Sequence, residues 1–339
     1  MGLAGIPKPP RFARRVLPVV WPVGAAAVTG LATPVIVAGA FHAFVDKRAR
    51  LFRVSCLGVG LVWVDVRMLL DCWRLRLKDR DGTGPTWEDD HEQVFLAGLN
   101  RAMILGKRWV GFEVRLDDRM HFGNEGAPLV AFARHAGPGD SIALAWLLGH
   151  TAGRMPKIVL AEALRWDPMV DTLLTQMRSY FVPSRTGAGD DRVEGVRELA
   201  RGLKHDDVLL LFPEGQNFSP DRRRRLISRL REAGQELRAR RAVSLWNTLP
   251  PKTKGVVAVL DERPDADVMI VGHAGFGHLS TPREIWDAIP FTDRPFLVRT
   301  HTYAAGDVPD DAPAIAEWLD ERWTEIDDWV TAYEGSGTA

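Results

Sequence analysis

The strongest constraint on this chain of 339 residues is an uncharged run near its beginning. From Val16 to Val45, thirty consecutive positions hold no Asp, Glu, Lys or Arg, and they are mostly Val, Ala, Leu, Ile, Gly and Pro. A helix needs about 20 apolar residues to cross a bilayer, so the run is long enough to do so. Several prolines interrupt it, which leaves open one tilted helix or two short helices hinged near Leu31 to Pro34.

Basic residues flank this run on both sides, and both ends therefore prefer the cytoplasmic face of a membrane. A re-entrant or interfacial hairpin satisfies that preference better than a single span. We expect the protein at the cytoplasmic face of the inner or plasma membrane, in contact with membrane lipids. The flanking residues are Lys8, Arg11, Arg14, Arg15, Lys47, Arg48, Arg50 and Arg53.

A second stretch, Leu51 to Leu77, mixes Leu, Val and Trp with charged residues, which predicts a helix that lies in the membrane interface. The alternative for the first run is a cleaved secretory signal that ends at the small residues Ala38 to Ala40. The run is longer than the core of about 7 to 15 residues that such signals have, and prolines break it. The sequence therefore favours a membrane-associated helical anchor over residues 1–78.

Composition excludes several partners. The chain has 44 Lys plus Arg and 44 Asp plus Glu, so no net field attracts it to nucleic acid. The two cysteines, Cys56 and Cys72, cannot form a disulfide scaffold. His121 and His150 are isolated from other ligand residues, so no metal or other cofactor is expected.

The rest of the chain alternates short apolar runs with helical patterns. Residues 79–92 are polar and read as a linker, so residues 79–339 are expected to form the second domain. This alternation predicts the α/β class, a mixed sheet flanked by helices. The expected strands are 129–133, 158–160, 208–212, 268–271 and 296–300, and the expected helices include 141–148, 168–179, 191–203 and 312–330.

His135 and Asp140 stand five positions apart, directly after the first of these strands. The Gly-Pro-Gly segment between them can turn the chain back, so that the carboxylate reaches one imidazole nitrogen and leaves the other free. A carboxylate in this place fixes the tautomer and favours the imidazolium, as a general base requires. The alternative is that Asp140 caps the helix that follows and His135 fills a turn.

Phe212-Pro213-Glu214-Gly215 ends a second buried strand, where α/β sheets usually place a site. Arginines follow it at 222–225, 229 and 231. They are either a solvated helix face or a receptor for phosphate or anionic lipid.

In these motifs the sequence resembles the glycerophospholipid acyltransferase superfamily, typified by 1-acyl-sn-glycerol-3-phosphate acyltransferases. His135 and Asp140 match its His-four residues-Asp element, and Phe212 to Gly215 match its Phe-Pro-Glu-Gly element. Residues 157–185, which end in Phe-Val-Pro-Ser-Arg185, look like the segment between them, and Val268 to Gly272 is similar to the last strand.

The resemblance implies an acyltransferase that moves a fatty acyl group from acyl-CoA or acyl carrier protein to the hydroxyl of a lysophospholipid or related glycerol phosphate, foremost lysophosphatidate. His135 and Asp140 would be catalytic. Arg185 would hold the acceptor phosphate, and Glu214 would contact the acceptor's glycerol or organise the loop, with Gly215 beside it. Oxyanion donors would be backbone N–H groups near Gly137 to Ser141 or near Gly215.

The sequence departs from the family's pattern in two places. Arg134 stands where many members have Asn, and Gln216-Asn217-Phe218 stands where the family often has Thr-Arg-Ser. In the family the missing arginine would help to hold the acceptor phosphate, so either Arg222 to Arg225 substitute for it or the acceptor is a different one. The rival functions are a serine hydrolase, which lacks its G-x-S-x-G motif here, and a catalytically inactive membrane lipid-binding protein of the same fold.

Overall fold

The structure is a computed structural model that describes residues 6–117, 121–124, 126–137, 139–183, 189–277, 279 and 281–335. The chain forms two compact units. One contains residues 1–113, 145–195 and 288–293, and the other contains residues 114–144, 196–287 and 294–339. A boundary between the units falls within each of two helices, α4 (Asp140–Trp146) and α6 (Gly189–Arg201).

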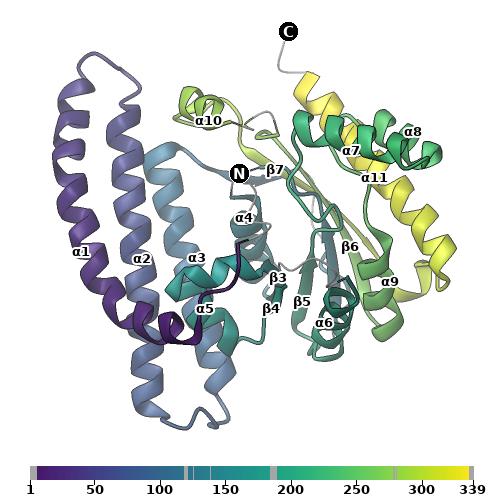
Figure 1. The fold of residues 1–339 in the computed structure, drawn as a ribbon, viewed down its shortest axis with the longest axis horizontal. Helices are drawn as coiled ribbons and strands as arrows, with labels where there is room; N and C mark the ends of the chain where they lie inside the picture. The colour runs from purple at the N-terminus through teal and green to yellow at the C-terminus, as the bar shows by residue number, and fades with distance from the viewer. Residues whose placement is uncertain are drawn as a thin grey trace. The chain divides into compact units, whose positions relative to one another are not determined.

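The first unit is mainly helical (Figure 1). In it α1 (Arg11–His42) packs on α2 (Arg50–Lys78), and α2 packs on α3 (Trp87–Val110). A short parallel pair of strands, β3 with β4, lies in the same unit. Its remaining elements are the π-helix η1 (Leu147–Thr151), β3 (Met155–Ala161), the 3-10 helix η2 (Glu162–Trp166), α5 (Pro168–Gln176) and β4 (Tyr180–Val182).

Helix α1 runs without interruption through the expected hinge at Leu31 to Pro34, with three prolines inside it. Contacts with α2 hold it along its length. Trp63 Nε1 donates to Thr29 Oγ1 at 2.9 Å, and a Cβ on Gly39 would lie 2.8 Å from the backbone nitrogen of Phe52. This packing supports one continuous helix where the sequence left two alternatives open. By length and composition α1 is able to cross a membrane.

The linker expected over residues 79–92 is shorter, because α3 already begins at Trp87. Glu88, Asp89 and Asp90 lie in its first turn, where negative charge favours a helix start, so the polar residues that suggested a linker belong to the helix. Gly98 lets α3 approach α2 closely, since a Cβ there would lie 2.2 Å from the sulfur of Met68. The domain boundary at residue 78 stays a prediction.

The second unit contains strands in the order β1-β7-β6-β2-β5. All neighbours are parallel except β6 and β7, which are antiparallel, so the sheet is mixed. Its strands are β1 (Val114–Leu116), β2 (Leu129–Ala133), β5 (Asp207–Leu211), β6 (Asp267–Ala274) and β7 (Phe296–Tyr303). Its further helices are α7 (Pro220–Glu232), α8 (Glu236–Ser244), α9 (Thr253–Glu262), α10 (Pro282–Ala288), the 3-10 helix η3 (Ala305–Asp307) and α11 (Ala312–Gly335).

The core of this unit is the central part of the sheet. Every residue of β2 and β6 is buried, and α11 packs on β6 and on α9 (Figure 1). Strands buried on both faces need nearly continuous apolar runs, and these two sequences supply them. The expected α/β class with a mixed sheet and flanking helices is confirmed.

Candidate active site

The candidate site lies where β2, β5 and β6 end. Because both neighbours of β2 run parallel to it, the carboxyl ends of the three strands share one edge of the sheet. The segments that follow them therefore meet: Arg134 and His135 after β2, and Phe212 to Gly215 after β5. Open α/β sheets place ligands at such an edge.

His135 and Asp140 are brought into contact as the spacing predicted. Nδ1 of His135 lies 2.9 Å from Oδ2 of Asp140, and since a carboxylate only accepts, Nδ1 carries the hydrogen. Nε2 of a neutral ring then keeps its lone pair, and in the described part of the chain it has no hydrogen-bond partner. The His135 side chain is 20% exposed, whereas that of Asp140 is 2% exposed. The pair can thus accept a proton from a molecule outside.

Asp140 is held in place by the backbone as well. Its Oδ2 accepts from the N–H of Ala136 at 2.9 Å and of Gly137 at 3.3 Å, and its Oδ1 accepts from the N–H of Ser141 at 2.6 Å. Burial alone would raise the pKa of Asp140, but the hydrogen bonds and charges of His135 and His273 outweigh it and hold that pKa well below its ordinary value. Asp140 is therefore a buried anion beside the His135 ring.

A second histidine, His273 near the end of β6, lies beside Asp140. Its Nε2 donates to the carbonyl of Arg134 at 3.0 Å and lies 3.6 Å from Oδ2 of Asp140. The ring is buried and stacks on Phe296 with the centroids 4.7 Å apart. Burial lowers its pKa, with the Asp140 carboxylate acting in the opposite direction. No motif in the sequence pointed to His273, because 138 positions separate it from His135.

Glu214 is 2% exposed, and its carboxylate joins two loops. Oε1 accepts from the N–H of His135 at 3.2 Å, and Oε2 accepts from the N–H of Leu249 at 3.0 Å. Burial raises the pKa of Glu214 to about 7, against the opposing effects of the Arg134 charge and of these two donors. In this structure Glu214 organises the loop that carries His135.

Arg134 was noted in the sequence only as a departure, yet it is fully buried at the centre of the site. Its Nε and Nη2 donate to the carbonyl of Asn247 at 3.1 and 2.8 Å, and its Nη1 donates to the carbonyl of His273 at 2.5 Å. One guanidinium thus ties the end of β2 to the end of β6 and to the loop around Asn247.

That loop is fixed from its other side by Asp327 of α11. Its carboxylate accepts from the N–H of Trp246 at 2.8 Å, the N–H of Asn247 at 2.7 Å and the hydroxyl of Thr248 at 2.9 Å. Asp327 is 2% exposed, although acidic side chains usually lie on the solvent face of such a helix. Its hydrogen-bond donors lie about 80 residues earlier in the chain. The periodicity of apolar residues along the helix therefore could not reveal these contacts.

The arginines that follow Gly215 each contact different groups. Nη1 of Arg222 donates to the carbonyl of Asn217 at 2.8 Å, Arg223 donates to carbonyls at the end of α8 and beyond, and Arg224 pairs with Asp221. These contacts connect helices and turns within the unit. Binding of substrate by Arg222 stays a prediction. Arg185, the expected phosphate ligand, lies outside the described residues.

Three of the backbone N–H groups expected to bind an oxyanion, those of Gly137, Ser141 and Gly215, already have acceptors in this structure. The N–H groups of Ala136, Gly137 and Ser141 donate to Asp140, and that of Gly215 donates to the carbonyl of Phe212 at 2.9 Å. Among the described residues, no group of three or more His, Cys, Asp or Glu side chains is arranged to hold a metal ion.

A protein-family model described as Acyltransferase matches residues 114–270. This range contains the hydrogen-bonded residues of the site from Arg134 to Leu249, and His273 and Asp327 lie beyond it. The match supports an acyltransferase domain in this segment, which begins at β1 and reaches into β6.

Among solved structures, the chain is similar to the 1-acyl-sn-glycerophosphate (LPA) acyltransferase PlsC from Thermotoga maritima. The two share 15% sequence identity with a TM-score of 0.53, over 84% of this chain and 95% of the other. At this identity the likeness establishes the fold of the acyltransferase and not its substrate. No curated protein matches the sequence.

Proposed function

We propose that this acyltransferase transfers a fatty acyl group from acyl-CoA or acyl carrier protein to the hydroxyl of a lysophospholipid or related glycerol phosphate, with lysophosphatidate as the foremost acceptor. The observation that carries the proposal is the His135 ring, which is bonded to Asp140 through Nδ1 and partly exposed. The acyltransferase family match and the PlsC-like fold support the same class of reaction.

The proposed reaction needs no covalent enzyme intermediate. Nε2 of His135 takes the proton of the acceptor hydroxyl while its oxygen attacks the thioester carbonyl. Asp140 stabilises the imidazolium that forms, as the anionic member of the pair. When the tetrahedral intermediate collapses, the carbon–sulfur bond breaks, the thiolate leaves, and the imidazolium returns the proton to it. The products are the acylated acceptor and a free thiol.

Membrane association is the second part of the proposal. Both substrates carry fatty chains, and α1 is long and apolar enough to enter a bilayer. An enzyme attached at the cytoplasmic face would meet them without their transfer through water. The role of Arg185 in holding the acceptor phosphate belongs to this proposal as well.

The test is acyl transfer from labelled acyl-CoA to a panel of lysophospholipids by the full-length protein in liposomes. His135→Ala should lower transfer by about 10²- to 10⁴-fold, the usual contribution of a positioned general base. His205→Ala is the matched control, because His205 is exposed and precedes the amino end of β5, away from the edge that carries the site. Equal transfer by both variants would remove His135 as the base. If no lysolipid is acylated by the wild-type protein, the alternative of an inactive lipid-binding protein replaces the proposal.

A further inference from the structure

Two buried side chains hold the peptide group that joins Arg134 to His135. Its carbonyl accepts from Nε2 of His273 at 3.0 Å, and its N–H donates to Oε1 of Glu214 at 3.2 Å. As whole residues, His273 is 1% and Glu214 2% exposed. Because a peptide group is planar, bonds to its carbonyl and to its N–H set the orientation of the backbone from which the His135 ring extends.

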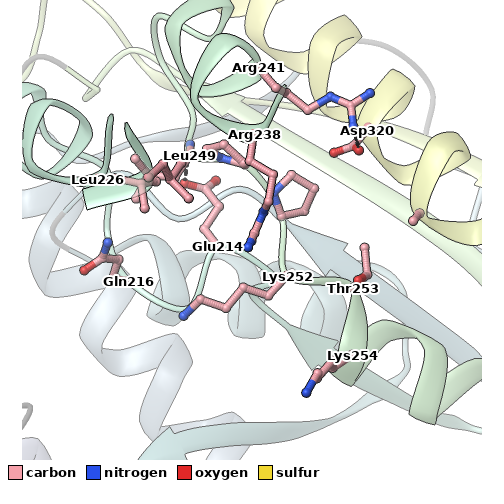
Figure 2. Close-up of a pocket in the computed structure, with 14 residues that line it drawn as sticks. Glu214, Gln216, Leu226, Arg238, Arg241, Leu249, Lys252, Thr253, Lys254 and Asp320 are labelled. Carbon is pink, nitrogen blue, oxygen red and sulfur yellow. Dashed lines mark hydrogen bonds and ion pairs between the residues drawn. The ribbon is translucent and has the colours of Figure 1, made fainter. Parts of the chain in front are cut away.

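Glu214 is a fixed acceptor in this arrangement. Its Oε2 accepts from the N–H of Leu249 at 3.0 Å, in the wall of a cavity of about 510 Å³ (Figure 2). Both oxygens of the carboxylate are therefore engaged, each by a different loop. The N–H side of the peptide group is thus held by the turn after β5, and its carbonyl side is held from β6 by His273.

His273 and Arg134 exchange two hydrogen bonds. Nε2 of His273 donates to the carbonyl of Arg134, and Nη1 of Arg134 donates to the carbonyl of His273 at 2.5 Å. The N–H of Arg134 also donates to the carbonyl of Val271 at 2.9 Å. Together these bonds extend the contact between β2 and β6 past the end of β2, up to the residue before His135.

The tautomer of His273 follows from its partner. A carbonyl only accepts, so Nε2 carries the hydrogen, and burial lowers the pKa of the ring and favours its neutral form. Nδ1 is then an acceptor, and within the described chain it is buried without a hydrogen-bond partner. An unpaired buried polar atom costs free energy, and an apolar side chain could pack on Phe296 without that cost. The presence of a histidine here is therefore better explained by its Nε2 than by packing.

The same nitrogen lies close to the carboxylate that orients the His135 ring. Nε2 of His273 is 3.6 Å from Oδ2 of Asp140, and this oxygen accepts from Nδ1 of His135 at 2.9 Å. His273 is thus near both groups that determine the direction of the His135 ring, the peptide group that precedes it and the carboxylate bonded to it.

We propose that His273 is a positioning residue for acyl transfer, which holds the peptide group before His135 and the Asp140 carboxylate so that Nε2 of His135 faces the acceptor hydroxyl. The inference rests on the proposed function and adds to it a residue from β6. His273 is buried and touches no substrate, so it acts through His135. Small displacements matter in such a site, because a shift of about 1 Å can lower a rate by about 10²-fold.

Three variants of the full-length protein separate positioning from packing. His273→Gln carries an amide N–H at about the place of Nε2, His273→Asn carries the same amide one carbon nearer the backbone, and His273→Leu has no donor. In acyl transfer in liposomes, His273→Gln should keep nearly the wild-type kcat. His273→Asn and His273→Leu should lower kcat by about 10- to 100-fold and leave KM for both substrates unchanged. If His273→Leu does not fold, the Gln and Asn variants make the same comparison.

A second measurement needs no turnover. In protein with ¹³C-labelled histidine, the His135 signal is identified by its loss from His135→Ala, and the chemical shift of Cδ2 reports which nitrogen of the neutral ring carries the hydrogen. Wild type and His273→Gln should show hydrogen on Nδ1 of His135, whereas His273→Asn and His273→Leu should show a mixture of tautomers. His301→Leu is the matched control, because His301 is an exposed histidine of the neighbouring strand β7. It should change neither kcat nor the tautomer of His135.

The comparison of Gln with Asn and Leu decides the proposal. Equal kcat values in these three variants, or a rise in both KM values together with the fall in kcat, would overturn it, because loss of packing would then account for the effect. If the wild-type protein acylates no lysolipid, the proposed function fails. The tautomer of His135 then tests the positioning role by itself, and the same tautomer in all the His273 variants would reject it.

Discussion

Helix α1 and the edge of the sheet around His135 present opposite distributions of polarity. On α1, large apolar side chains are exposed: Val23 is 74%, Leu31 79% and Phe41 71% exposed. At the sheet edge, charged residues are buried: as whole residues, Arg134 is 0%, Asp140 1% and Glu214 2% exposed. Soluble proteins seldom expose many large apolar side chains together, and they seldom bury a charge that has no hydrogen bond or ion pair.

The partners differ in kind. Each buried charge at the sheet edge forms hydrogen bonds with groups of the same unit. These hydrogen bonds offset the free-energy cost of removing the charge from water. The α1 side chains Val23, Leu31 and Phe41 are exposed, and a bilayer is the apolar medium proposed for them. The comparison teaches that the position of His135 is set by contacts within the chain, whereas contacts within the chain leave much of the apolar surface of α1 exposed.

Removing the buried guanidinium should have the greatest effect on stability. Arg134→Met leaves the carbonyls of Asn247 and His273 without their donor and Glu214 without its nearby cation. We expect a loss of about 3–5 kcal/mol in the free energy of unfolding, the usual cost of breaking a buried charged network. Urea titration in detergent measures it, with Arg240→Met as a surface control that should change stability by less than about 0.5 kcal/mol. Equal stability of the two variants would show that the buried network contributes nothing.

Charges placed on α1 should affect membrane binding and not the sheet edge. Val23→Arg and Leu31→Arg introduce guanidinium groups near the middle of the helix, at a cost of about 2.5–3.5 kcal/mol each in a bilayer. Flotation with liposomes should therefore recover less of these variants. Leu237→Arg is the control, because Leu237 is an equally exposed apolar residue, 83%, on α8. Unchanged flotation of the α1 variants would count against insertion of this helix.

The third prediction concerns acid. The pKa of Asp140 is lower in the folded protein than its ordinary value of 3.8, so its contribution to stability is present above that pH and is lost as the pH falls below it. Asp140→Asn should lower the free energy of unfolding at neutral pH by about 1–3 kcal/mol, because hydrogen bonds to a buried carboxylate are lost. The difference between wild type and variant should shrink as the pH falls below about 4. A difference that stays constant down to pH 2 would contradict the low pKa of Asp140.

The sequence predicted the structural features that depend on residues close together in the chain. The strands β2, β5 and β6 followed from apolar runs, and the contact between His135 and Asp140 followed from their spacing. These features need only neighbouring residues to form, so one sequence contains enough information to predict them.

The remaining features depend on contacts between distant residues. His273 and Asp327 meet the site only when β6 and α11 pack on the sheet, and Lys252 reaches Gly215 across 37 positions. The arginine run was easier to notice than Lys252, although Nζ of Lys252 lies beside Gly215. Charge density along a sequence does not tell which charge the fold places beside a given turn.

The most direct measurement is a structure of the full-length protein with a non-hydrolysable acyl-CoA analogue and a lysophospholipid. The account predicts the acceptor hydroxyl within about 2.6–3.2 Å of Nε2 of His135, with Nδ1 still bonded to Asp140. An acceptor hydroxyl bound elsewhere, with Nε2 facing only solvent or protein, would contradict general-base catalysis by His135.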